Sequence, residues 1–323
     1  MHLHLKFPSK NGQLKVARYL FPQYINSARA RDFANWLYLA PGLAFFTMFQ
    51  AAPILGVLWM SFTDYHFIRQ SPSKFVGLEN YANALRDPIF YVGLLRAATF
   101  TVIFVPVCIC VPLLIAILVD RVSQPTLSTI YRVILLIPAV IPGAMIFILW
   151  RWLLDFEIGP VNVILVDYLR VFTFRSAPQW VGDSPLALPA IAFIAVWWGL
   201  GYHTMFFLAG LAAIPKELFE AARTDGAGEW EMFWYVTLPR LQPVMLILVV
   251  LRFGSAMAVV DEFLIMGGLS RGMPTFTWTV YMYQLSFKLG EWFQGYAASI
   301  GWLGAIVMLG VVSTMLYVFR DQD

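Results

Sequence analysis

The sequence predicts an all-α membrane protein with six transmembrane helices. Of its 323 residues, 60% are hydrophobic and only 13% are charged, whereas about a quarter of the residues in soluble domains are charged. The apolar residues also gather into six long runs. Each run approaches or exceeds the ~20 residues that an α-helix needs to cross a bilayer. An ordinary soluble domain is therefore excluded.

Polar segments separate the six predicted spans and define the domain organisation. The spans cover residues 36–62, 91–119, 133–154, 188–214, 241–266 and 297–319. They form one membrane domain over 36–319, with a basic N-terminal arm at 1–35 and a short tail at 320–323. The loops between the spans hold about 30 residues at most, which is too few for an independently folding domain.

The third predicted span cannot be a straight helix. It contains Pro138, Pro142 and Gly143, and a proline inside a helix removes a hydrogen bond and clashes with the preceding turn. Neighbouring helices or water must then satisfy the freed carbonyl groups, because lipid cannot. We therefore expect a bend in this span.

The distribution of lysine and arginine predicts the orientation of the chain. The N-terminal arm, residues 120–132, residues 215–240 and the tail together hold twelve of these residues, against seven in the other three loops. Because cytoplasmic loops carry the excess of basic residues, we expect both termini to be cytoplasmic. Residues 215–239 are themselves rich in acidic side chains, which contribute little to orientation.

A polar segment at 215–239, PKELFEAARTDGAGEWEMFWYVTLP, interrupts the apolar sequence between the fourth and fifth spans. Pro215 suits the first turn of a helix, where its missing N–H has no cost. Leu218, Phe219 and Ala222 then share one helical face. A short amphipathic helix on the membrane surface is predicted.

A second short helix is predicted to follow in the same segment. Gly226 and Gly228 interrupt the first helix, and Trp230 and Phe233 begin a new apolar face. Pro239 is expected to end this second helix where the fifth span begins. The segment is therefore a helix, an exposed bend of small residues, and another helix.

This segment resembles the EAA signature of ABC importer permeases. The residues that match it are Glu220, Ala221, Ala222, Asp225, Gly226, Ala227, Thr237, Leu238 and Pro239. In that family the signature forms a cytoplasmic coupling helix that docks in a groove of an ATPase, so the resemblance implies a coupling loop at 215–239 and a type I ABC importer permease fold. The alternative, from the residues alone, is an amphipathic loop that rests on lipid headgroups.

The resemblance extends over nearly all of residues 36–319. VGLENY at 76–81 is similar to the outer loop after the first span in sugar-importer permeases, and GPVN at 159–162 also resembles the family. The last outer loop matches the family pattern at Gly267, Gly268, Pro274, Thr275, Tyr283, Phe287, Gly295 and Ala298. This implies import of a sugar, with a di- or oligosaccharide as the expected substrate. The alternatives are a polyol phosphate such as glycerol-3-phosphate, another small solute and, more remotely, an intramembrane enzyme or scaffold.

The chain is expected to work with partner proteins. It has no glycine-rich ATP-binding loop ending in GK[ST], so we expect it to bind no cofactor. The resemblance implies a second, different permease subunit, two ABC subunits that bind ATP and Mg²⁺, and an extracytoplasmic substrate-binding protein. It also implies a place among the lipids of a bacterial or archaeal plasma membrane, and no nucleic-acid partner.

The residue types that usually carry catalysis or bind metals form no recognisable pattern. Cys108 and Cys110 lie two residues apart in an apolar run, on different helix faces, and are expected to be small buried hydrophobes. His203 is the one histidine within a predicted span, and no zinc-binding spacing surrounds it. G-x-S-x-G and H-E-x-x-H motifs are absent.

Candidate residues for a substrate path lie in the fourth and fifth spans. VWWGLGYH at 196–203 combines broad indole faces, on which sugar C–H faces stack, with glycines that allow close approach. Tryptophan in a span is also commonly a packing residue. In similar disaccharide permeases, ligand contacts fall on this stretch and on the middle of the next span. The candidates are Trp197, Trp198, Gly199, Tyr202, Arg252, Phe253, Gly254, Met257 and Asp261.

This chain departs from the family at some of these positions. The best-known family members carry amides at several of them, where this chain has Ala195, Val196, Gly254 and Met257. Either the pocket is more apolar here or the partner permease binds the ligand. Charges within spans are costly and usually face a cavity or a partner, so Arg252 either lines the path or pairs with another helix. Asp261 and Glu262 could also mark the outer end of the fifth span.

Overall fold

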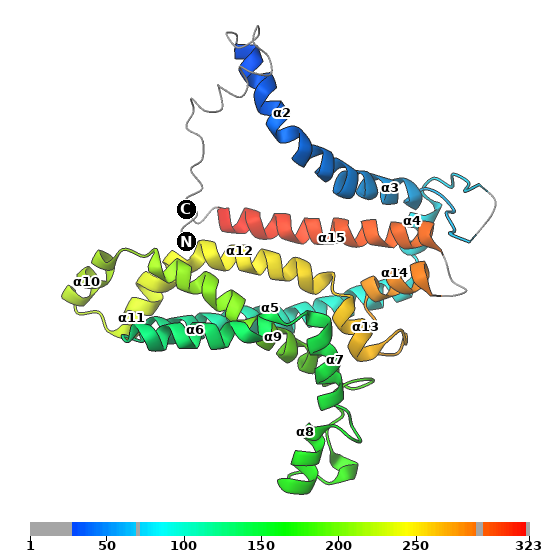
Figure 1. Cartoon of the computed structure of the whole chain (residues 1–323). Coiled ribbons are helices and arrows are strands. Elements are labelled where there is room, and N and C mark those ends of the chain that lie inside the picture. Colours follow the sequence, from blue (N-terminus) through cyan, green and yellow to red (C-terminus); the bar gives the residue numbers. More distant parts are fainter. Residues whose placement is uncertain (1–27, 69–71, 289–292, 321–323) are drawn as a thin grey trace, which may run out of the picture. The chain divides into compact units, whose positions relative to one another are not determined.

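A computed structural model describes residues 28–68, 72–288 and 293–320 of the chain. Most of the predicted basic arm and nearly all of the short tail lie outside these residues. The regular secondary structure of the described part is helical, apart from one isolated β-bridge between Thr63 and Phe75, and loops join the helices. The all-α class predicted from the sequence is confirmed (Figure 1).

The described helices divide between two compact units, Met1–Trp59 and Met60–Asp323. The helices of the first unit, of which the last runs two residues past its boundary, are α2 (Ala28–Phe46), the π-helical turn η1 (Thr47–Ala51) and α3 (Ala52–Ser61). The helices of the second unit are α4 (Glu79–Ala84), α5 (Pro88–Asp120), α6 (Pro125–Val140), α7 (Gly143–Leu153), α8 (Pro160–Val163), η2 (Ile164–Tyr168), η3 (Phe174–Ser176), α9 (Ala187–Ala212), α10 (Lys216–Thr224), α11 (Glu229–Met232), η4 (Phe233–Thr237), α12 (Leu238–Met257), α13 (Asp261–Gly267), α14 (Trp278–Phe287) and α15 (Gln294–Arg320).

Five helical stretches among the described residues are long and apolar enough to cross a membrane, and the bent pair α6 and α7 makes a sixth if it counts as one span. The five are Asn35–Ser61, Pro88–Asp120, Ala187–Ala212, Glu229–Met257 and Gln294–Val318. Asn35–Ser61 exposes large apolar side chains on all sides, Trp36 and Phe49 among them. A helix that is hydrophobic all round is typical of a span.

Helices α5, α6, α9 and α12 form the centre of the second unit, where α5 and α6 both pack along α9 and α12 packs on α5 (Figure 1). Phe207 of α9, Leu241 and Leu248 of α12 are fully buried between these helices. Gly201 allows α9 to approach α6 closely, because a Cβ atom on Gly201 would lie 2.2 Å from the carbonyl oxygen of Leu135 on α6. These helices hold the candidate site.

The predicted bend in the third span is confirmed. Helices α6 and α7 meet at 87° across Ile141 and Pro142. The Nε1–H of Trp198 on α9 donates to the carbonyl oxygen of Ile141 at 3.0 Å. The Trp198 ring also packs against Gly143 so closely that a Cβ atom on Gly143 would lie 2.8 Å from the ring. The neighbouring helix therefore satisfies a carbonyl that the bend frees, as a membrane interior requires.

Pro239 does not end a helix, contrary to the prediction from the sequence. The chain stays helical from Glu229 to Met257, and Pro239 occupies the first turn of α12, directly after the π-helical turn η4. A π turn changes the hydrogen-bond register of the backbone. Pro239 lies in the first turn of the α-helix that follows. Its missing N–H has little cost there, because the first turn of a helix does not use that donor.

The fifth span ends earlier than residue 266, its predicted limit. Helix α12 stops at Met257, and a separate helix, α13, begins at Asp261. Side chains of α14 and its N-cap region bind the carbonyl groups at the break, since Trp278 Nε1 donates to Met257 at 2.9 Å and Thr279 Oγ1 donates to Val259 at 2.6 Å. Partners from a distant part of the sequence therefore replace the helical hydrogen bonds.

Candidate functional site

The polar segment forms the helix, bend and helix that the sequence predicts. After α10, the N–H of Gly226 donates to Arg223 at 3.0 Å and the N–H of Ala227 donates to Ala222 at 2.9 Å, the pair of bonds that defines a Schellman motif. Gly226 has a φ of +86°, a conformation that glycine adopts without strain. A Cβ atom at Gly226 would meet nothing within 4 Å, so the bend projects into open space.

The second half of the segment is tied to the end of α5. Arg121, the residue after α5, pairs with Glu229 at 2.9 Å, and Arg223 of α10 lies 3.8 Å from the same carboxylate. Glu231 Oε2 accepts from the N–H of Gly228 and caps α11. The three side chains that form the two ion pairs are exposed, so each pair contributes only about 0.2–1 kcal/mol. The pairs chiefly fix where the bend lies.

One face of α10 is packed and the other is free. Leu218 and Phe219 pack against the hydrophobic cluster formed by α5, α9 and α12, while Glu220, Ala221 and Asp225 are exposed. Beside α10 lies a cleft of about 310 Å³ that Glu220 and Arg223 line together with Arg121. The matched residues therefore present an open surface at one end of the unit.

The residues predicted for coupling occupy three places along this surface. Glu220, Ala221 and Ala222 lie on α10, Asp225, Gly226 and Ala227 form the bend, and Leu238 and Pro239 begin α12. Leu238 packs against the same cluster as Phe219. Leu238 therefore anchors the base of the segment, while the bend is its exposed tip.

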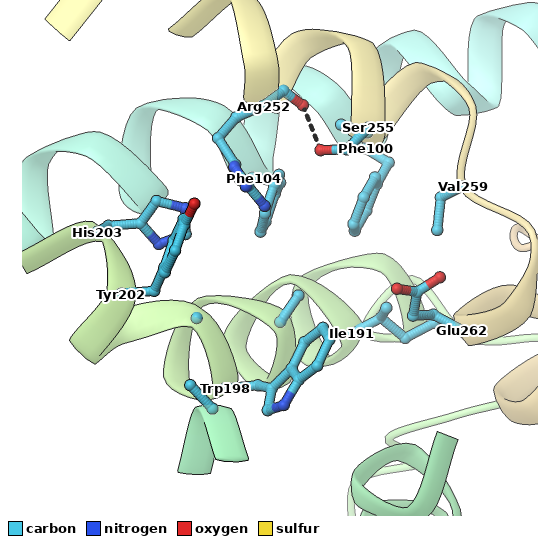
Figure 2. Close-up of a pocket in the computed structure, with 14 residues that line it drawn as sticks. Phe100, Phe104, Ile191, Trp198, Tyr202, His203, Arg252, Ser255, Val259 and Glu262 are labelled. Carbon is cyan, nitrogen blue, oxygen red and sulfur yellow. Dashed lines mark hydrogen bonds between the residues drawn. The ribbon is translucent and has the colours of Figure 1, made fainter. Parts of the chain in front are cut away.

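A second hollow lies among the helices of the unit's centre (Figure 2). It has a volume of about 260 Å³ and is lined by residues of α5, α6, α9, α12 and α13 and by Val259 in the α12–α13 linker. Aromatic rings form much of its wall: Phe100 and Phe104 of α5 stack with 5.4 Å between their centroids, and Trp198 and Tyr202 face the cavity from α9. We call this hollow the central pocket.

Four of the nine residues predicted for a substrate path line the central pocket: Trp198, Gly199, Tyr202 and Arg252. Five do not line it: Trp197, Phe253, Gly254, Met257 and Asp261. The ring of Trp197 packs edge-on against Trp150 at 5.7 Å, and Met257 is buried at the end of α12. The early end of α12 turns Asp261 out to an exposed position and brings its neighbour Glu262 to the pocket.

Several pocket residues could not be found by sequence reasoning. Phe100 and Phe104 lie i, i+4 on α5, a spacing that also suits ordinary packing. Glu262 was interpreted only as a mark of the outer end of the fifth span, because the end of α12 depends on hydrogen bonds from α14. Ser255 lies within α12 and belongs to no motif. His203, which stands alone in the sequence, is buried against Cys108, with 3.7 Å between Nε2 and Sγ.

The polar groups of the central pocket are few and distinct. Arg252 projects into it from α12, and among the described residues its buried Nε has no hydrogen-bond partner. Ser255 Oγ donates to the carbonyl oxygen of Arg252 at 3.1 Å (Figure 2). Glu262 lies on α13, outside the spanning helices, and burial, together with the charge of Asp261, raises the pKa of its carboxyl above the ordinary value.

No group of three or more histidine, cysteine or acidic side chains in the described part of the chain is placed to hold a metal ion. Cys108 is buried and Cys110 is exposed, and neither is in a disulfide. The exposure of Cys110 corrects the expectation that both thiols are buried. The arrangement of the central pocket suits binding of an organic molecule rather than of a metal ion.

Comparisons with known proteins identify the family. Residues 113–322 match the sequence profile of the "Binding-protein-dependent transport system inner membrane component". The chain is 32% identical to the arabinooligosaccharides transport system permease protein AraP of Bacillus subtilis, over 86% of each chain. It is 31% identical to the trehalose/maltose transport system permease protein MalF of Thermococcus litoralis, over 82% of this chain and 87% of that protein.

The fold is also that of a solved importer. A chain of a bacterial ABC transporter involved in the import of alginate superimposes with a TM-score of 0.77, covering 90% of this chain and 96% of that chain at 21% identity. The family match extends over well over half of the 323 residues. The chain therefore belongs to the binding-protein-dependent transport inner-membrane components and is a multi-pass permease subunit of the carbohydrate ABC importer family rather than an enzyme.

Proposed function

We propose that this permease subunit forms half of a translocation path for a di- or oligosaccharide, and that the central pocket is its contribution to the substrate site. The observation that carries the proposal is the wall of the pocket, where the rings of Trp198 and Tyr202 face a cavity among spanning helices. Aromatic faces bind the apolar C–H faces of sugars. The relatives named for arabinooligosaccharides and for trehalose and maltose support a saccharide substrate.

A second, different permease subunit completes the site. At about 260 Å³, the central pocket is slightly smaller than the roughly 300–1,000 Å³ of typical ligand pockets. A disaccharide therefore needs a further wall. The all-round apolar surface of Asn35–Ser61 is available to lipid or to that subunit.

Two ATPase subunits drive the transport from the cytoplasmic side. They bind ATP and Mg²⁺, for which this chain has no glycine-rich loop. The exposed face of α10, with Glu220, and the bend at Gly226 dock in the ATPase groove, a helix-in-groove contact. ATP binding moves the groove, and the helices rock between inward- and outward-facing states, because each ligand prefers one of the two.

A substrate-binding protein delivers the saccharide from outside. One solved alginate transporter of the same fold is in complex with a periplasmic protein that carries an alginate pentasaccharide, which supports the same arrangement here. Both termini and residues 215–239 then face the cytoplasm, in accord with the bias of basic residues. The host membrane is bacterial or archaeal.

The proposal is tested by transport. The chain is co-expressed with candidate permease, ATPase and binding-protein partners, the complex is placed in proteoliposomes, and ATP-dependent uptake of labelled di- and oligosaccharides is measured. We expect uptake of at least one saccharide, and we expect Trp198→Ala to reduce it about tenfold or more, since loss of a central aromatic contact typically costs about 2 kcal/mol or more.

Two results would refute this function. No uptake of any saccharide by an assembled, ATP-hydrolysing complex would exclude sugar import. If Trp198→Ala lowers only the amount of protein in the membrane and leaves uptake per complex unchanged, the ring has a packing role. Trp197→Ala is the matched control, because Trp197 packs on Trp150 and does not line the pocket.

A further inference from the structure

We propose that the transported saccharide carries an acidic group, such as a uronate carboxylate, and that the guanidinium group of Arg252 binds this group in the central pocket. The inference rests on the proposed function, because it assigns a substrate class to that same pocket. It is carried by three observations: the position of Arg252, the absence of a partner for its Nε among the described residues, and the aromatic wall that faces it.

Arg252 lies where a charge is costly. It is in the C-terminal half of α12, within the spanning stretch Glu229–Met257. An arginine inside a span costs several kcal/mol by insertion scales unless it faces a cavity or a counter-charge. Arg252 lines such a cavity.

The other two arginines within the predicted spans show how this fold satisfies a structural guanidinium. Arg96 of α5 donates to the carbonyl oxygens of Arg271, Gly272 and Phe276 at 2.9–3.4 Å. Arg151 of α7 donates to the carbonyl oxygen of Ile265 at 2.6 Å. Both of these arginines hold neighbouring segments in place.

Arg252 has no comparable contact in the described part of the chain. Its Nε is buried without a hydrogen-bond partner, and the two ion pairs found among the described residues both involve Glu229, near the bend. The neighbouring polar side chains are His203, which is buried against Cys108, and Ser255, which bonds the backbone of Arg252. Arg252 as a whole is half-buried and lines the pocket, so the rest of its guanidinium is open to an anion that enters the cavity.

One acidic side chain, Glu262, also lines the pocket, but it does not pair with Arg252. Figure 2 shows the two side chains on different sides of the cavity, and no ion pair joins them. Burial favours the neutral form of the Glu262 carboxyl. On its own side of the cavity Glu262 can bond the hydroxyl groups of a sugar, while Arg252 is the arginine among the lining residues and can meet an acidic group.

The rings determine which class of anion fits. Phe100, Phe104, Trp198 and Tyr202 surround the space in front of the guanidinium. A sugar ring supplies apolar faces for these side chains and, as a uronate, a planar carboxylate that matches the two-pronged guanidinium. A small polyol phosphate has an anion but no ring face, so it would leave the aromatic wall unused.

The experiment uses the assembled importer in proteoliposomes and matched pairs of disaccharides, each a neutral sugar and its uronate, in the gluco, galacto and manno configurations, with glycerol-3-phosphate as a further probe. We expect one uronate to compete for uptake at concentrations at least tenfold lower than its neutral partner. Arg252→Gln should weaken that uronate about 10- to 100-fold, the usual effect of losing a charge-assisted hydrogen bond, and should leave the neutral partner within about threefold. Arg252→Lys should recover part of the preference.

The control is Arg132→Gln, the same chemical change at an exposed position of α6 outside the pocket, which should alter neither probe. The inference is overturned if neutral disaccharides compete as well as uronates, if glycerol-3-phosphate competes better than every saccharide, or if Arg252→Gln prevents copurification of the partner permease, which would make Arg252 an interface residue. In the first of these cases saccharide uptake itself still supports the proposed function. Absence of uptake of every saccharide would refute both.

Discussion

At the scale of single residues, the structure separates side chains that hold the fold from those that are free to bind. Trp198 does both, because its Nε1–H satisfies the carbonyl of Ile141 at the bend while its ring lines the central pocket. A ligand that moves this ring would therefore act directly on the junction of α6 and α7. Gly201, one turn away, has only a structural task.

Gly201 gives the first residue-scale prediction. A Cβ atom there would lie 2.2 Å from the carbonyl oxygen of Leu135, so Gly201→Ala must push α6 away from α9. Overpacking of this kind costs about 1–3 kcal/mol. We expect a lower midpoint of thermal unfolding for the purified subunit in detergent.

Gly310→Ala is the matched control for this prediction. Gly310 is also in a spanning helix, but a Cβ there meets nothing within 4 Å, and alanine is the better helix former by roughly 0.5–1 kcal/mol. Its unfolding midpoint should stay or rise. Equal midpoints for the two variants would show that α6 and α9 do not approach closely at Gly201.

At the scale of helices, the sequence predicted those bends that nearby prolines and glycines determine. Prolines and a glycine predicted the bend between α6 and α7, and glycine at 226 predicted the bend after α10. The end of α12 could not be predicted, since Trp278 and Thr279 bind its last carbonyl groups from about 20 residues away. For the same reason Glu262, rather than Asp261, lines the central pocket.

The bend after α10 carries the element-scale prediction. Gly226→Leu places a bulky side chain in a left-handed conformation that costs L-residues roughly 1–2 kcal/mol and fills the open space at the tip. We expect the variant to reach the membrane in normal amount but to lose most ATP-driven uptake, while the ATPase subunits keep hydrolysing ATP. Uptake and hydrolysis are measured in the same proteoliposomes.

Gly226→Asn is the companion variant for this measurement. Asparagine tolerates positive φ better than other non-glycine residues, and its side chain is small. It should keep more transport than Gly226→Leu. Unimpaired uptake by Gly226→Leu would exclude the bend as a docking element.

At the scale of the whole molecule, the topology of the chain depends on whether α6 and α7 cross the membrane together. The helices meet at 87°, so they fit either a broken span or a re-entrant loop. The two arrangements differ in topology. A broken span places the bend after α10 on the same side of the membrane as the α5–α6 connection and residues 155–187 on the opposite side, whereas a re-entrant pair exchanges these two positions. The excess of basic residues in alternate connecting segments favours the broken span.

Labelling of engineered cysteines decides between these topologies. Cys110, the exposed native thiol, is first changed to serine, and Asp225→Cys and Tyr168→Cys are then made separately, both at exposed positions. With a membrane-impermeant maleimide on intact cells, we expect labelling of the cysteine at 168 but of the one at 225 only after the membrane is opened. One span, α9, lies between positions 168 and 225, so the two cysteines lie on opposite sides of the membrane in either topology, and the one that is labelled identifies the topology. Labelling at 225 in intact cells together with protection at 168 would make α6 and α7 a re-entrant pair and would place the bend outside, where no ATPase could reach it.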